Sequence, residues 1–128
     1  MDVANLTPRN PTIAIVEDDP SLLGALTFAL EADGFEVLAH SAGMSFLAAP
    51  RPVDCIIVDM RLPDTDGLTL VARLREKGVW APAILITTNP DARIRRTAEA
   101  LGVQIVEKPL ISGELRRRID ELIAANSH

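Results

Sequence analysis

The sequence predicts an α/β fold, a doubly wound three-layer sandwich in which a five-stranded parallel sheet lies between layers formed by five helices. Strand and helix signals alternate five times along the 128 residues. Three of the five strand segments are almost wholly apolar, and continuous apolar strands are typical of a parallel sheet that helices cover on both faces. A chain of this length is expected to form one domain with a single hydrophobic core.

Five short segments rich in β-branched and aliphatic residues are the expected strands. The helices fall between and after them and are marked by their own start and stop signals. The strand segments are Thr12–Val16, Phe35–Ala39, Asp54–Val58, Ala83–Ile86 and Val103–Val106.

The first helix is expected to begin with Asp19 as its cap and Pro20 at its first position, and Gly34 ends it. Asp followed by Pro is a helix-start signature, so Asp19 is interpreted as a cap and not as a metal ligand. The second helix, Gly43–Ala49, is the shortest. The apolar stripe of the first helix consists of Leu22, Leu23, Leu26 and Leu30.

Asp66 is the expected cap of the third helix, and Gly78 stops it. Asp64 and Asp66 flank a turn that contains Pro63 and Gly67, so both are interpreted as turn and cap residues. The apolar face of this helix carries Leu68, Val71 and Leu74.

Asn89 and Pro90 repeat the opening of the first helix, so the fourth helix is expected to start there and to end at Gly102. Ser112 is the expected cap of the fifth helix. The inner face of the fifth helix carries Leu115, Ile119, Leu122 and Ile123.

Composition excludes several classes of protein. A net charge of -5, three Phe, one Trp and no Tyr argue against direct nucleic-acid binding. No apolar run approaches the roughly 18 residues that span a membrane, and the start of the chain lacks a signal peptide. The single cysteine, Cys55, lies in an apolar strand and is expected to be a buried small hydrophobe. We therefore expect a cytoplasmic protein with a flexible lead-in (1–11), one domain (12–125) and a polar tail (126–128).

Polar side chains stand where four apolar runs end. Glu17 and Asp18 follow the first strand, Asp59 the third, Thr87 the fourth and Lys108 the fifth. Because ligands bind outside the carboxyl ends of the strands in an open parallel sheet, these residues are expected to converge on one site. The site would contain three carboxylates, one hydroxyl and one ammonium group.

Three neighbouring carboxylates repel one another, so a cation is expected to neutralise them. Mg²⁺ suits this donor set because it binds one or two carboxylates directly and completes its shell with waters and phosphate oxygens. Asp18 and Asp59 are the expected direct ligands, with Glu17 acting through water. A carboxylate beside Mg²⁺ can also attack phosphorus to form an aspartyl phosphate. Lys108 and Thr87 would then contact the phosphoryl oxygens, and Pro109 makes a cis peptide bond accessible after Lys108.

The sequence resembles the receiver domain of two-component response regulators, which has the fold of the chemotaxis regulator. The resemblance extends from Thr12 to Ala125, and it implies a flavodoxin-like sheet of strand order 2-1-3-4-5. The motifs that carry it are Val16-Glu17-Asp18-Asp19, Val58-Asp59-Met60-Arg61-Leu62-Pro63-Asp64, Asp66-Gly67, Ile86-Thr87-Thr88 and Glu107-Lys108-Pro109.

The resemblance implies a role for each site residue. Asp59 would be the phosphoacceptor for a sensor histidine kinase or a histidine phosphotransfer protein. Glu17, Asp18, Asp59 and the backbone carbonyl of Arg61 would hold Mg²⁺, for which Mn²⁺ can substitute. Thr87 would be the switch hydroxyl and Lys108 the contact to the phosphoryl group.

Four positions shape the expected switch. Receivers often carry Tyr or Phe three residues before the lysine, whereas this chain has Ile105, which puts coupling by an aromatic switch in doubt. Thr88 replaces a residue that is usually small. With Arg61 and Asn89, it is expected to control access of water to the acyl phosphate and so to set the lifetime of the phosphorylated state.

We expect a phosphorylation-dependent signalling domain of a two-component system, which catalyses only its own phosphorylation and dephosphorylation. Phosphorylation would change the surface formed by the fourth helix, the fifth strand and the fifth helix, where a downstream protein or a second copy of the chain would bind.

Two other functions remain open from the sequence. One is a Mg²⁺-dependent phosphohydrolase with an aspartyl nucleophile, although Arg61 occupies the place of its general acid. The other is a degenerate receiver that acts only as a binding module.

Other polar residues have simpler interpretations. Arg116, Arg117 and Arg118 precede Asp120 and Glu121 at helical spacing, so intrahelical ion pairs are favoured over a nucleic-acid patch. His40 and His128 have no spacing typical of metal ligands and are assigned no role.

Overall fold

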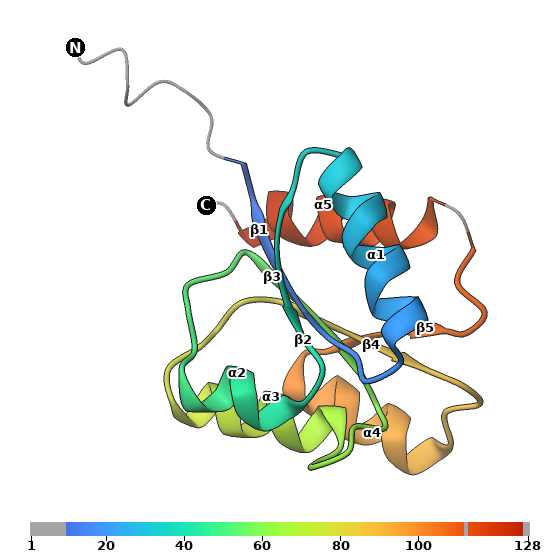
Figure 1. Ribbon diagram of the computed structural model, residues 1–128. Helices are drawn as coiled ribbons and strands as arrows, with labels where there is room; N and C mark the ends of the chain where they lie inside the picture. The colour runs from blue at the N-terminus through green and yellow to red at the C-terminus, as the bar shows by residue number, and fades with distance from the viewer. Residues whose placement is uncertain (1–9, 112, 127–128) are drawn as a thin grey trace.

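The structure is a computed structural model that describes residues 10–111 and 113–126 (Figure 1). Most of the predicted lead-in and tail lies outside these residues, as does Ser112, the predicted cap of the last helix. Within the described part of the chain, none of the helices has both the length and the apolar character that crossing a membrane requires.

Five parallel strands form one sheet in the order β2-β1-β3-β4-β5, which confirms the predicted topology. Their bounds are β1 Thr12–Val16, β2 Glu36–His40, β3 Cys55–Asp59, β4 Ala83–Thr87 and β5 Gln104–Glu107.

Four of the five predicted strands had boundaries that were wrong by one residue, seven boundaries in all. The Phe35 and Val103 amides donate to the carbonyls of Leu30 and Ala98 at the ends of the preceding helices, so β2 and β5 begin one residue later than expected. At the other end, backbone pairing includes polar residues that the apolar pattern left out. Asp59 extends β3 by pairing with Ile86 of β4, and Thr87 extends β4 by pairing with Glu107 of β5. The pairing of β1 with β3 begins at Ile13 and Cys55, so β3 starts at Cys55 and not at Asp54.

Helices cover both faces of the sheet (Figure 1). The helices α1 and α5 lie on one face, and α2, α3 and α4 lie on the other. Their bounds are α1 Pro20–Ala32, α2 Gly43–Ala48, α3 Gly67–Glu76, α4 Ala92–Leu101 and α5 Glu114–Asn126.

Alternate residues of the central strands enter two separate cores. In β1, Ile13 and Ile15 face α1 and α5, whereas Ala14 and Val16 face α2, α3 and α4. All four are fully buried. Cys55 is buried as predicted, and burial raises the pKa of its thiol to about 12, so the reactive thiolate is scarce at neutral pH.

Two predicted caps are confirmed and one is wrong. Asp19 accepts hydrogen bonds from the amides of Ser21 and Leu22 at the start of α1, and Asp66 accepts one from Thr69 at the start of α3. The cap of α4 is Asp91, which accepts from the Ile94 amide at 2.8 Å, and not Asn89.

Asn89 cannot serve as that cap because its backbone has a φ of 47°, whereas a capping residue takes an extended conformation. The chain therefore turns once more before α4 begins, and Pro90 lies in this turn instead of at the first helical position.

The start of α2 is capped from a distant part of the chain. Ala42, the residue before α2, provides no side-chain cap. Asp64, in the loop between β3 and α3, accepts hydrogen bonds from the amides of Gly43 at 3.0 Å and Met44 at 2.7 Å. Asp64 is therefore not only a turn residue, because it joins the loop that follows Asp59 to the neighbouring helix.

The arginines of α5 form ion pairs within the helix, as predicted. Arg116 pairs with Asp120 at 3.0 Å and Arg117 with Glu121 at 3.2 Å. Arg118 pairs with Glu114 at 3.4 Å.

Candidate functional site

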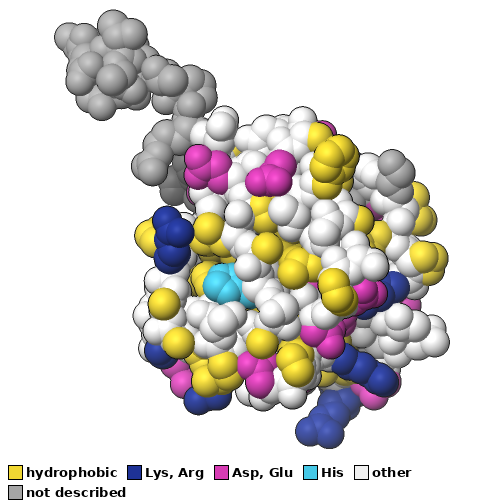
Figure 2. Space-filling view, viewed as in Figure 1, with side chains coloured by type: hydrophobic (Ala, Val, Ile, Leu, Met, Phe, Trp, Pro, Cys, Tyr) yellow, Lys and Arg dark blue, Asp and Glu magenta, His cyan; other side chains and the backbone are white. Residues whose placement is uncertain are grey.

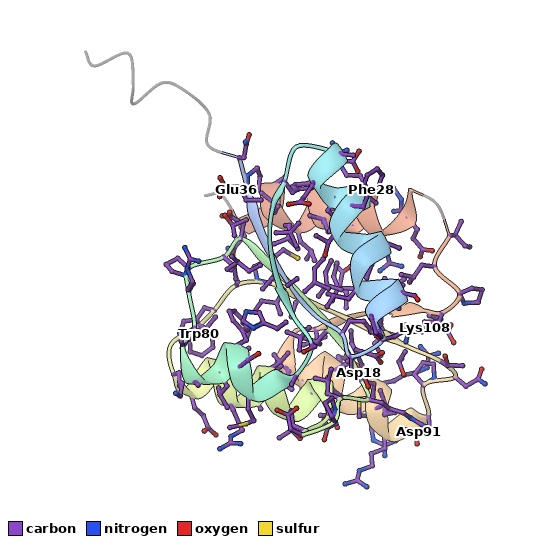
Figure 3. All side chains as sticks on the ribbon, viewed as in Figure 1. Asp18, Phe28, Glu36, Trp80, Asp91 and Lys108 are labelled. Carbon is purple, nitrogen blue, oxygen red and sulfur yellow. The ribbon has the colours of Figure 1, made fainter. Side chains whose placement is uncertain are left out.

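The predicted site residues meet in one pocket of about 560 Å³ at the carboxyl ends of β1, β3, β4 and β5. Figure 3 labels two of them, Asp18 and Lys108, near each other beside the first turn of α1. Ile105 does not line this pocket, because its side chain packs against the core on the α2, α3 and α4 side of the sheet. The pocket is lined by Glu17, Asp18, Asp19, Asp59, Arg61, Thr87, Thr88, Asn89 and Lys108.

Asp59 is the last residue of β3, and only 6% of it is exposed. Its Oδ2 accepts a hydrogen bond from Lys108 Nζ at 2.8 Å, and its Oδ1 accepts one from the Arg61 amide at 3.2 Å. Burial by itself would raise the pKa of Asp59, but the Glu17 carboxyl, Lys108 and the Arg61 amide outweigh it and lower that pKa. Asp59 is therefore an ionised carboxylate held in a defined orientation.

Glu17 is the most buried carboxyl group of the site, with 1% of the residue exposed. Its Oε1 accepts a hydrogen bond from the Asp19 amide at 3.1 Å, whereas its Oε2 is buried and has no hydrogen-bond partner among the described residues. Burial, together with the neighbouring Asp59 carboxylate, raises the pKa of Glu17 to about 8. The metal-free site thus favours a protonated Glu17 at neutral pH.

Three carboxylates form a cluster suited to a cation. Glu17, Asp18 and Asp59 each offer one oxygen, and these oxygens lie within 4.8 Å of one another. Asp18 is exposed to solvent, so an ion can enter from that side. Among the described residues, none donates a hydrogen bond to the buried Glu17 Oε2, and the atoms that could bind an ion are carboxylate oxygens. An acidic pocket of this kind fits a hard divalent cation such as Mg²⁺.

The hydroxyl and the ammonium group are placed by adjacent strands. Thr87 ends β4 and is 6% exposed. The Lys108 amide donates to the Thr87 carbonyl at 2.8 Å, which ties the two residues together where their strands end. The Lys108–Pro109 peptide bond is cis. Nearby carboxylates, chiefly Asp59, raise the pKa of Lys108 although burial alone would lower it.

The pocket rim carries the residues expected to modulate the reaction. Arg61, Thr88 and Asn89 are all exposed, and all three line the pocket. Arg61 also forms an isolated bridge with Asp66, which fixes the backbone of the loop that follows Asp59.

One residue important to the site geometry was not singled out from the sequence. A Cβ atom at Gly67 would collide with the Asp59 carbonyl oxygen and approach Leu85 Cδ1 at 2.9 Å. The Gly67 amide also donates to the Met60 carbonyl at 2.9 Å. Glycine is required here because α3 begins directly against the backbone of Asp59. The sequence marks Asp66-Gly67 as a cap, a turn and one motif of the family resemblance, but the contact of Gly67 with the Asp59 backbone has no local sequence signal.

Comparison with known proteins adds independent findings. A family model described as the response regulator receiver domain matches residues 13–120. The transcriptional regulatory protein FixJ of Azorhizobium caulinodans is 32% identical over 105 residues, which cover 80% of this chain and 50% of that protein. The transcriptional regulatory protein TrcR of Mycobacterium tuberculosis is 30% identical over 119 residues, which cover 91% and 46%. The chain spans about half the length of these curated relatives.

Solved structures show the same fold. The non-phosphorylated receiver domain of HemR from Leptospira biflexa superposes with a TM-score of 0.83 at 29% identity, covering 90% of this chain and 95% of that one. The crystal structure of FixJ-N gives a TM-score of 0.80 at 28% identity, covering 93% and 97%. The names of the sequence relatives do not support our prediction that nucleic acid is absent from the partners, because those proteins are transcriptional regulators.

Proposed function

Because the chain belongs to the family of response regulator receiver domains, we propose that a histidine kinase or histidine phosphotransfer protein transfers a phosphoryl group to Asp59 in a Mg²⁺-dependent reaction in the cytoplasm. One observation carries the proposal. Asp59 is a buried, ionised carboxylate whose Oδ2 lies 2.8 Å from Lys108 Nζ, and two further carboxylates lie beside it.

In the proposed step an Asp59 oxygen attacks the phosphorus of a phosphohistidine. The O–P bond forms as the P–N bond breaks, and the electron pair of that bond leaves with the imidazole. Lys108 then pairs with a phosphoryl oxygen in place of Asp59 Oδ2, and the Thr87 hydroxyl donates to another oxygen. The burial of Asp59 and Thr87 supports this assignment because it keeps bulk water from the acyl phosphate.

Asp18, Asp59 and the Arg61 carbonyl would hold Mg²⁺ directly, with Glu17 acting through water, and Mn²⁺ would substitute. The cation supplies positive charge that offsets the carboxylates and the incoming phosphoryl oxygens. The cluster of carboxylate oxygens within 4.8 Å supports this ligand set.

Phosphorylation adds about -1.5 to -2 charges to the site, if a phosphomonoester is a fair guide. We assign the response to a shift of Thr87 and α4 that repacks the surface of α4, β5 and α5. On that surface Arg95 pairs with Glu107 at 3.7 Å, and Arg118 donates to Gln104 at 3.1 Å. A downstream protein or a second copy of the chain would bind there.

The side chain of Ile105 is an aliphatic substitute for the aromatic switch residue. It is partly buried and packs against the core shared with α4, so it can transmit a shift of α4 by packing without a ring rotation. We therefore place the coupling in the contacts between Ile105 and α4.

The rim residues Arg61, Thr88 and Asn89 are proposed to set the lifetime of the phosphorylated state by limiting the access of water. All three line the pocket that contains Asp59. Thr88→Ala and Arg61→Ala are expected to change the rate of autodephosphorylation, measured by loss of phosphorylated mass with time. Unchanged rates in both variants would contradict this role.

The central test is incubation with acetyl phosphate, with and without Mg²⁺, followed by intact-protein mass spectrometry. We expect one phosphoryl group on the wild-type chain only with Mg²⁺, and none on Asp59→Asn. Modification of Asp59→Asn at the wild-type rate would overturn the assignment. Continuous release of phosphate from a phosphoester would favour a phosphohydrolase, and a chain that never takes up phosphate would favour a constitutive binding module.

A further inference from the structure

A groove of about 730 Å³ lies between α3 and α4, outside the pocket that contains Asp59. Its floor is apolar and comes from both helices and from the residue after β3, with Met60, Leu68, Ile94 and Leu101 lining it. Leu68 is buried, but the other three remain partly exposed. The described part of the chain places nothing over this apolar surface.

Small residues along the groove allow another backbone to approach closely. Thr69 and Ala72 contribute from α3, and Thr97 and Ala100 from α4. Each helix has 10 residues, so the groove runs for about 15 Å at 1.5 Å per residue. A short amphipathic helix of a partner fits these dimensions, and helix-in-groove binding uses such surfaces.

The charges on the rim select the partner. Arg93 and Arg96 line the groove, are exposed and form no ion pair with any described residue. Asp66 and Asp91 also line it, but each caps a helix and faces the partial positive charge of that N-terminus. Both Asp66 oxygens already accept hydrogen bonds from Thr69.

The unbalanced charge of the groove is thus positive. Figure 2 shows Lys and Arg side chains that project from the lower right of the molecule, where α4 lies in Figure 1.

We infer that the groove between α3 and α4 is the docking site for an acidic amphipathic helix of a partner protein. Apolar residues at helical spacing would cover Met60, Ile94 and Leu101, and carboxylates on the flank of the helix would pair with Arg93 and Arg96. This surface differs from the α4, β5 and α5 surface because it lies on the α3 side of α4.

Met60 places the groove next to the phosphoacceptor. It follows Asp59 directly, its amide donates to the Ile86 carbonyl at 3.1 Å, and its carbonyl accepts from Gly67. A helix bound in the groove would therefore contact the residue that joins Asp59 to α3. This consequence alone rests on the proposed function, whereas binding itself does not require phosphorylation.

The test is selection of binders from a display library of random peptides of about 15 residues against the full, unphosphorylated chain. Because the library is random, nothing forces its members to be acidic. We expect enriched peptides to carry apolar residues at i, i+3 or i+4 and i+7, with more Asp and Glu than Lys and Arg.

Affinities of the enriched peptides are then measured by fluorescence anisotropy for four forms of the chain. Arg93→Glu combined with Arg96→Glu, and separately Ala100→Trp, should each weaken binding by about tenfold or more. The matched control combines Arg51→Glu with Arg73→Glu, two exposed arginines outside the groove, and should bind like the wild type. Far-UV circular dichroism checks that every variant is folded.

Enrichment of neutral or basic peptides would overturn the inference, as would failure to enrich any peptide. Equal affinity for wild type and Ala100→Trp would place the binding elsewhere and also overturn it. Binding of anionic lipid vesicles that is lost in the Arg93 and Arg96 variant, without peptide enrichment, would assign the groove to a membrane surface instead. Because no phosphodonor is present, these outcomes do not depend on whether Asp59 is phosphorylated.

Discussion

Replacement of Glu17 by Gln should remove a pH dependence of stability from the metal-free protein. Burial and the Asp59 carboxylate raise the pKa of Glu17 from 4.5 to about 8. The folded state therefore binds a proton at Glu17 between these pH values and the unfolded state does not. The free energy of unfolding that this proton contributes is fully present below pH 4.5 and is lost as the pH rises through about 8.

The expected magnitude follows from about 1.4 kcal/mol per pH unit for one proton. Between pH 6 and pH 8 the folded state goes from almost fully to half protonated at Glu17. The wild type should then lose about 2 kcal/mol of its free energy of unfolding in EDTA relative to Glu17→Gln. Burial lowers the pKa of His40, which also makes stability depend on pH, but this contribution is present in both proteins and cancels in the difference.

The assay is urea unfolding followed by circular dichroism at pH 6, 7 and 8, with EDTA or with Mg²⁺. Glu99→Gln is a matched control, because Glu99 is exposed on α4. This substitution should leave unchanged the slope of the free energy of unfolding plotted against pH. Mg²⁺ should flatten the slope of the wild type, since a bound cation favours ionised Glu17. If wild type and Glu17→Gln have the same slope in EDTA, the raised pKa and the burial argument behind it are wrong.

Three further substitutions test the geometry of the site. Gly67→Ala should lower the free energy of unfolding by about 2 to 3 kcal/mol in urea titrations, because the added Cβ meets the Asp59 carbonyl. The control Gly24→Ala has open space around it in α1 and should raise the free energy of unfolding by about 0.5 to 1 kcal/mol. Equal effects would contradict the close approach. Lys108→Gln should raise the pKa of Asp59, read from its carboxyl ¹³C shift, and slow phosphorylation by acetyl phosphate; an unchanged titration would mean that the 2.8 Å pair does not control Asp59. Asp64→Ala should lower the midpoint of urea unfolding and raise hydrogen exchange at the first amides of α2, because it removes their acceptor; unchanged exchange would exclude this cap.

The sequence predicted the parts of the fold that depend on local patterns. Apolar runs located the strands, and the polar residue after each run located Glu17, Asp18, Asp59, Thr87 and Lys108 in one pocket. This worked because parallel strands bring their carboxyl ends to the same edge of the sheet.

Features that depend on distant contacts were not predictable in this way. Asp64 caps amides that lie 20 and 21 residues earlier in the chain, which no local motif encodes. Gly67 is required by its contact with the Asp59 backbone. At the start of α4 the predicted cap was Asn89, but its φ of 47° rules it out, and Asp91, two residues later, is the cap.

The direction of the parallel strands decides where in the molecule a fluorophore can detect phosphorylation of Asp59. Trp80 lies in the loop before β4, is 71% exposed and has the Arg75 guanidinium 5.8 Å from its ring, whereas Thr87 ends the same strand. A strand of five residues separates the two by about 16 Å, and Figure 3 shows Trp80 on the opposite side of the molecule from Asp18 and Lys108. The intrinsic fluorescence of Trp80 is therefore expected to stay unchanged when Asp59 is phosphorylated. An optical sensor needs its fluorophore at the other end of the strands, for example by Trp80→Phe combined with Met60→Trp.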